Sequence, residues 1–145
     1  MLEGVSISSN EDLKNKALMT SLYANLRSIH DIDVQYFTEL IALFSEQEKK
    51  LEAAKNSGVA FEKGFLEGGL QSLSDQKQKL ESLKETESES FLAYRKFFKW
   101  VLDHQADISI EGGQVKLKTE SLQNEYDEIT KSALIAEEAH NRLLQ

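Results

Sequence analysis

The fold is decided by the stretch Phe91-Leu-Ala-Tyr-Arg-Lys-Phe-Phe-Lys-Trp-Val-Leu102, which holds the densest group of aromatic residues and the single tryptophan of a 145-residue chain. Its apolar residues recur in steps of three, four or seven, and the recurrence extends back to Leu70 and Leu73. This spacing is that of one helical face. We therefore predict a central helix over residues 69–105, with the other helices packed along it.

Stepping about 100° per residue separates two kinds of side chain on this helix. One side is apolar and is expected to face the core: Phe91, Tyr94, Phe97, Phe98, Trp100 and Val101. Arg95, Lys96 and Lys99 fall on the opposite side around Leu92. We interpret this side as a basic surface of the helix that faces solvent. The alternative is that it anchors the protein to an anionic membrane surface or an acidic partner.

Residues 1–9 are expected to form a flexible tail, followed by a long helix over residues 10–57. No glycine or proline occurs from Asn10 to Lys55, and apolar residues repeat every seven positions through the polar run at 30–33. One uninterrupted helix is the prediction. The alternative is a break at 30–33, where an aspartate would cap a second helix.

Residues 58–69 are predicted to be a glycine-rich corner, because Gly64, Gly68 and Gly69 would each weaken a helix by about 1 kcal/mol relative to alanine. Phe61 and Phe65 are expected to close one end of the core. A phosphate-binding loop is rejected, because no strand precedes these glycines and no Lys-Ser/Thr pair follows them. The polar run at 84–90 is expected to continue the central helix as an exposed stretch, with a helix break there as the alternative.

The periodicity changes to two in residues 107–117, on either side of Gly112-Gly113. This pattern predicts a β-hairpin that pairs Ile110 with Val115 and Ile108 with Leu117 on one apolar face. An isolated hairpin is only marginally stable, so this face must be covered. It folds onto the end of the bundle or, as the alternative, meets a second chain.

The last helix is predicted over residues 119–145, where apolar residues repeat in sevens and His140 interrupts them as a polar residue that sets register. Glu137 and His140 also have the Glu-x-x-His spacing of di-metal bundles. Those centres need a second such motif, and neither His30 nor His104 has a glutamate three residues earlier. We therefore expect no metal, cofactor or catalytic site.

Composition limits the classes of partner. The formal net charge is −8, which argues against nucleic acid. The absence of cysteine rules out disulfides and thiolate chemistry. The first ten residues lack the pattern of a signal peptide, and no run approaches ~20 apolar residues. We expect a soluble, cytoplasmic protein, and secretion by an unrecognised route stays open.

These observations predict a single mainly α domain over residues 1–145. It is an elongated antiparallel bundle of three or four long helices with coiled-coil-like seams and one β-hairpin insertion. The expected function is a non-enzymatic interaction module, a subunit or adaptor whose partner is another protein or a second copy of itself. The alternative is a membrane-associating or membrane-curving helical dimer. The candidate partner-binding residues are Ile108, Ile110, Val115, Leu117, Arg95, Lys96 and Lys99.

Overall fold

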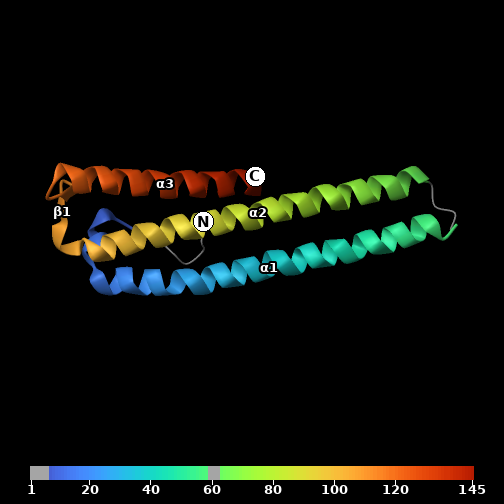
Figure 1. Cartoon of the computed structure of the whole chain (residues 1–145), viewed down its shortest axis with the longest axis horizontal. Coiled ribbons are helices and arrows are strands. Elements are labelled where there is room, and N and C mark those ends of the chain that lie inside the picture. The colour runs from blue at the N-terminus through green and yellow to red at the C-terminus, as the bar shows by residue number, and fades with distance from the viewer. Residues whose placement is uncertain (1–6, 59–62) are drawn as a thin grey trace.

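Helix α1 (Lys16–Asn56) is one uninterrupted helix of 41 residues, so the alternative break at 30–33 is wrong. In the computed structural model, which describes residues 7–58 and 63–145, it runs antiparallel to α2 along the whole length of an elongated molecule (Figure 1). The helix begins later than predicted, because Asn10–Lys14 forms a separate 3₁₀ turn. The side chain of Asn15 then caps α1 by accepting a hydrogen bond from the backbone N–H of Leu18 at 3.0 Å.

Of the tail predicted over residues 1–9, residues 1–6 lie outside the described part of the chain, and residues 8 and 9 are hydrogen-bonded to the segment before α1. The Asp12 carboxylate accepts hydrogen bonds from the backbone N–H groups of Ser8 and Ser9 at 2.9 and 3.2 Å. Leu13, one residue further on, is fully buried in the core. Local capping bonds and one apolar anchor therefore fix residues 8–14.

Helix α2 (Lys63–Asp103) begins inside the segment predicted as a glycine-rich corner, so the corner predicted at 58–69 is too long. Packing explains the glycine at position 69, because an added Cβ would lie only 3.3 Å from Leu51 Cδ1 of α1. Gly58, with a φ of 71°, closes the turn after α1. Phe65 is exposed rather than part of a core end, and Phe61 lies outside the described residues.

The core lies at the end of the molecule where α2 is covered on two sides. Helix α1 lies along one side of α2, and α3 (Glu120–Leu144) lies along the other side of its C-terminal half only (Figure 1). As predicted, the aromatic face of α2 is buried there, with Trp100 included. The buried cluster is formed by Leu13, Met19, Leu22, Leu26, Phe91, Phe97, Phe98, Trp100, Val101 and Ile108.

The hairpin joins α2 to α3 with the predicted register. Strand β1 (Ile108–Glu111) pairs antiparallel with β2 (Gln114–Leu117), and Ile110 lies opposite Val115. Gly112 and Gly113 have φ values of 58° and 77°, as a two-residue turn of this kind requires. Ile108 is buried in the core cluster, and the other three apolar hairpin residues pack against it. The apolar face thus packs against the bundle itself, with Ile108 buried and Ile110, Val115 and Leu117 partly buried.

We expect Ile108→Lys to lower the free energy of unfolding by several kcal/mol, because an unpaired ammonium would enter an apolar core. Ser109→Lys is the matched control, since Ser109 is exposed on the other face of β1. Urea denaturation followed by circular dichroism measures both variants. Equal stability of the two would show that the hairpin does not contribute to the core.

Candidate functional site

A buried polar layer crosses the three helices where α3 ends. Glu87 of α2 and His140 of α3 are only 2% and 4% exposed. Glu87 Oε2 lies 3.4 Å from His140 Nε2, and Thr86 Oγ1 lies 3.0 Å from His140 Nδ1. As predicted, α2 runs unbroken through residues 84–90. The expectation that this run is exposed is wrong, because Glu87 and Ser90 are buried, Glu87 against His140 of α3.

Helix α1 contributes Asp33 to the same layer. Its carboxyl group is close enough to that of Glu87 for the two charges to repel each other when both groups are ionised. Burial, and then the charge of Asp33, raise the pKa of Glu87 to about 7. Burial lowers the pKa of His140. Glu87 therefore carries a proton below neutral pH, and its 3.4 Å contact with His140 is then not an ion pair.

A cavity of about 370 Å³ opens beside this layer. Its floor is polar and its walls are apolar, and the lining residues are Ile29, Ile32, Asp33, Tyr36, Phe37, Glu87 and His140. The second carboxyl oxygen of Glu87, Oε1, is buried and receives no hydrogen bond from any described residue. Convergent polar groups at the base of an apolar hollow are typical of ligand-binding sites.

Further contacts between the helices continue the layer towards the hairpin end. The Tyr94 hydroxyl of α2 donates a hydrogen bond to the Glu137 carboxylate of α3. Burial and then this bond raise the pKa of Tyr94. On the α1 side, the ring of His30 stacks on Phe91 with ring centroids 4.1 Å apart. Burial lowers the pKa of His30.

The Glu-x-x-His pair does not act as one unit, because Glu137 contacts Tyr94 while His140 contacts Glu87. Among residues 7–58 and 63–145, no group of three or more histidine, cysteine, aspartate or glutamate side chains could hold a metal ion. The position of His140 is that of a polar residue buried in an interhelical seam. This matches its predicted place in the last helix.

The candidate partner-binding residues fall into two separate groups. Ile108, Ile110, Val115 and Leu117 share the apolar face of the hairpin, which lies against the core. Arg95, Lys96 and Lys99 are exposed on α2 around Leu92, which is 60% exposed. Arg95 Nε donates a hydrogen bond to the Tyr23 hydroxyl at 3.4 Å, and Lys99 pairs with Asp103 at 2.6 Å.

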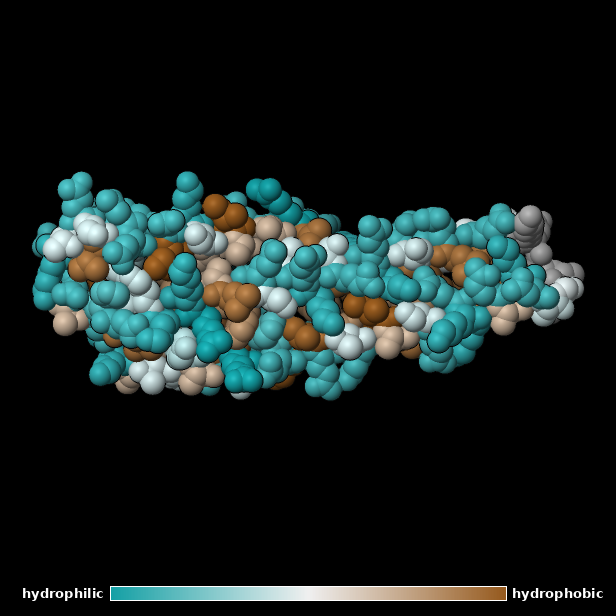
Figure 2. Space-filling view, in the orientation of Figure 1, coloured by the Kyte–Doolittle hydropathy of each residue, from teal (hydrophilic) through white to brown (hydrophobic). Residues whose placement is uncertain are grey.

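Sequence reasoning missed a row of apolar side chains on α1. Ile32, Tyr36 and Leu43 are 66%, 59% and 49% exposed, and their spacing of four and seven places them on one helical face. Ile32 and Tyr36 also line the cavity. The space-filling view shows apolar surface interrupting the polar surface at several places along the molecule (Figure 2). The spacing of these residues is visible in the sequence, but the seven-residue repeat used to predict the helix follows a different face of α1.

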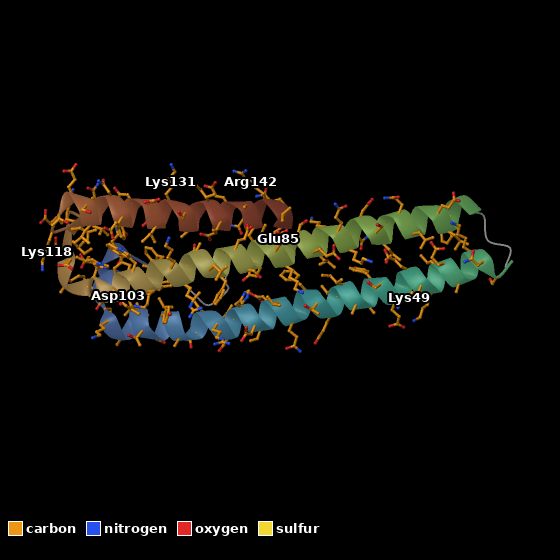
Figure 3. The ribbon with its side chains drawn as sticks, viewed as in Figure 1. Lys49, Glu85, Asp103, Lys118, Lys131 and Arg142 are labelled. Carbon is orange, nitrogen blue, oxygen red and sulfur yellow. The ribbon has the colours of Figure 1, made fainter. Side chains whose placement is uncertain are left out.

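Helix α3 exposes charged and apolar side chains together, and its exposed apolar residues are Leu134, Ile135 and Leu144 at 53%, 57% and 57%. Lys131 and Arg142 project away from α2, and Arg142 pairs with Glu138 on the same surface at 3.5 Å (Figure 3). Glu85 is exposed on α2 close to the end of α3 (Figure 3). Exposed pairs of this kind contribute little to stability. Exposed apolar side chains therefore occur on both α1 and α3, and the row on α1 is the one that lies beside the cavity.

We expect the stability of the protein to fall as the pH rises through the titration of Glu87. Its pKa of about 7 in the folded state lies above the ordinary 4.5, so the folded protein binds this proton more tightly than the unfolded chain does. That stabilisation is fully present below about pH 4.5 and is lost as the pH approaches 7. Glu87→Gln keeps the shape of the neutral group and should escape the loss.

The measured quantity is the difference in unfolding free energy between Glu87→Gln and the parent, from urea denaturation at several pH values between 4.5 and 8. This difference should grow in favour of the variant by up to about 3 kcal/mol and then level off. His140 is present in both proteins, so most of its own titration cancels. A difference that does not change with pH would mean that Glu87 is not protonated in the fold.

Comparison with known proteins adds no assignment to this geometry. No protein-family model, no curated protein sequence and no solved structure matches the chain. Within the described residues, no helix combines the length and apolar character needed to cross a membrane.

Proposed function

We propose that this protein is a non-enzymatic protein–protein interaction module, a subunit or adaptor that docks a helical segment of a partner against α1. The observation that carries the proposal is the exposed row of Ile32, Tyr36 and Leu43 beside the cavity. An apolar row along one helical face is what a partner helix recognises when it packs into a groove.

The part of the molecule that α3 does not cover also favours such a partner. We call it the two-helix arm, comprising residues 34–56 of α1 and 63–83 of α2 (Figure 1). The only buried residues of α1 are Met19, Leu22 and Leu26, which all lie outside the arm. Phe37 and Phe44 of the arm remain partly exposed. Helices bury their apolar stripes in packed layers, so a further helix along this seam would complete the packing.

The arm is held together without such a partner. Lys77 Nζ of α2 pairs with Glu48 Oε2 of α1 at 2.7 Å, and both side chains are largely shielded from solvent. Leu66 and Leu83 of α2 are buried. The proposed binding face is thus carried on a pre-formed pair of helices, which reduces the entropy cost of association.

A photo-crosslinking amino acid placed at position 36 tests this proposal in the native cell. We expect it to form a specific crosslink to a protein partner, because Tyr36 lies in the proposed interface. The same amino acid at position 38 is the control, since Thr38 is exposed on another face of α1. Loss of the position-36 product on changing Ile32→Ser and Leu43→Ser would support the helical face. Equal products at positions 36 and 38, or none at either, would overturn the proposal.

The alternative, a membrane-associating helical protein, rests on one specific observation. Leu92 is exposed among Arg95, Lys96 and Lys99, so this face of α2 combines an apolar side chain with three positive charges. Such a face could lie on an anionic lipid surface. The neighbouring aromatic residues do not add to it, because Phe97, Phe98 and Trp100 are buried in the core.

Co-sedimentation with vesicles that contain phosphatidylserine tests the alternative. If it holds, Lys96→Glu with Lys99→Glu should abolish binding while thermal stability stays nearly unchanged, because exposed charges contribute little to folding. Lys49→Glu with Lys50→Glu is the matched control on the two-helix arm. Absence of binding by the parent protein, or an equal loss in the control, would contradict the membrane alternative.

A further inference from the structure

A small hollow of about 180 Å³ between α1 and α2 is lined by two of the three arginines of the chain. Arg27 belongs to α1 and Arg95 to α2, and the other lining residues are Tyr23, Ala24 and Phe91. This arginine hollow shares no lining residue with the cavity beside the polar layer. A hollow lined by charges of one sign raises the local concentration of ions of the opposite sign, so two guanidinium groups here favour an anion.

Neither guanidinium group is neutralised by a closely bonded carboxylate. Arg27 Nε lies 3.9 Å from Asp31 Oδ2, which is beyond hydrogen-bond distance, and the Arg27 side chain is 83% exposed. Arg95 Nε donates a hydrogen bond to the Tyr23 hydroxyl at 3.4 Å, and no carboxylate among the described residues pairs with it. Since each guanidinium group has five N–H donors, most of these donors remain available to a ligand.

We propose that the arginine hollow binds the phosphate group of a phosphate monoester. Two guanidinium groups carry two positive charges, which match the charge of about −2 of a monoester at neutral pH. A carboxylate would balance only one of them. Planar guanidinium groups also suit phosphate, because each can form two parallel hydrogen bonds to its oxygens. This site goes beyond the proposed function, since it does not involve the apolar row of Ile32, Tyr36 and Leu43.

The size and the remaining wall of the hollow define the rest of the ligand. A volume of about 180 Å³ is below the roughly 300–1,000 Å³ of pockets that enclose a whole small molecule, so the hollow takes the phosphate group alone. The organic part of the ester then extends over the surface. The Tyr23 hydroxyl accepts the bond from Arg95, so its own proton can be donated to a phosphate oxygen.

Titration of the full chain with phenyl phosphate at neutral pH, followed by NMR of the arginine Nε–H groups, tests the inference. Arg142 is an internal control, because it lies on α3 and pairs there with Glu138. We expect saturable shifts of the Arg27 and Arg95 signals and none of the Arg142 signal. Methyl phenyl phosphate is the matched probe, since it keeps the ring but carries only one negative charge. It should bind about tenfold more weakly.

Two variants locate the site. Arg27→Gln and Arg95→Gln should each weaken binding of phenyl phosphate by about tenfold, because each removes one charge and its hydrogen bonds. Arg142→Gln removes the same charge outside the hollow and should bind like the parent. All three side chains are exposed, so thermal melts should show the same stability in every variant. Phenyl phosphate binding that neither hollow variant weakens, or that Arg142→Gln weakens equally, would overturn the inference.

The phosphate monoester can belong to a soluble molecule or to the head group of phosphatidic acid, and co-sedimentation with vesicles separates these sources. A preference for vesicles with phosphatidic acid over vesicles with phosphatidylserine, lost in Arg27→Gln, would identify the lipid. Binding of phenyl phosphate without that preference would identify a soluble ester. Absence of saturable shifts with phenyl phosphate, or equal affinity for the two phenyl probes, would overturn the inference whichever vesicles bind.

Discussion

The structure depends on a change in how many sides of α2 are covered along its length. In its N-terminal half, α2 has one packing neighbour, α1, and a single apolar stripe is sufficient. In its C-terminal half it lies between α1 and α3, so a wider apolar surface must be buried there. The aromatic residues from Phe91 to Trp100 supply that surface in a chain whose other helical stretches are mainly aliphatic and polar. Their bulk also fills the space that three helices leave between them at one end.

This distribution explains why sequence reasoning succeeded at the hairpin end. The two-residue repeat around Gly112-Gly113 fixes both turn type and register, because slipping by one residue would turn every apolar side chain outward. The aromatic side of α2 was also predictable, because basic and aromatic side chains fall on opposite sides of the helix when each residue is rotated by about 100°. Periodicity was likewise sufficient to show that α1 does not break at 30–33, because the apolar repeat continues through the polar residues.

The same reasoning failed where contacts between distant segments override local preference. Gly69 reads as a helix breaker, but in the fold it allows α1 to approach closely at Leu51. Glu87 reads as a solvated charge, because nothing near it in sequence shows that His140, more than fifty residues away, will cover it. The candidate site consists of residues of this kind, drawn from three helices. The apolar periodicity of one helix does not show whether a second helix covers its other side. The buried polar layer could therefore not have been predicted from the sequence.

The hairpin has a consequence for the order in which contacts can form. Starting from it, the α2–α3 contacts pair residues of growing sequence separation, from Trp100–Glu125 through Tyr94–Glu137 to Thr86–His140. For the α1–α2 contacts the sequence separation increases in the opposite direction along α2, from Lys77–Glu48 through His30–Phe91 to Arg95–Tyr23. Each contact shortens the loop that the next one must close, which keeps the entropy cost of each step small. Pairing of α2 with α3 can thus start at the hairpin, whereas pairing of α2 with α1 can start at the opposite end of α2. Along α3, each contact with α2 lies farther from the hairpin than the one before it. The contact of His140 with Thr86 is the one farthest from the hairpin, so it closes the longest loop among these α2–α3 contacts.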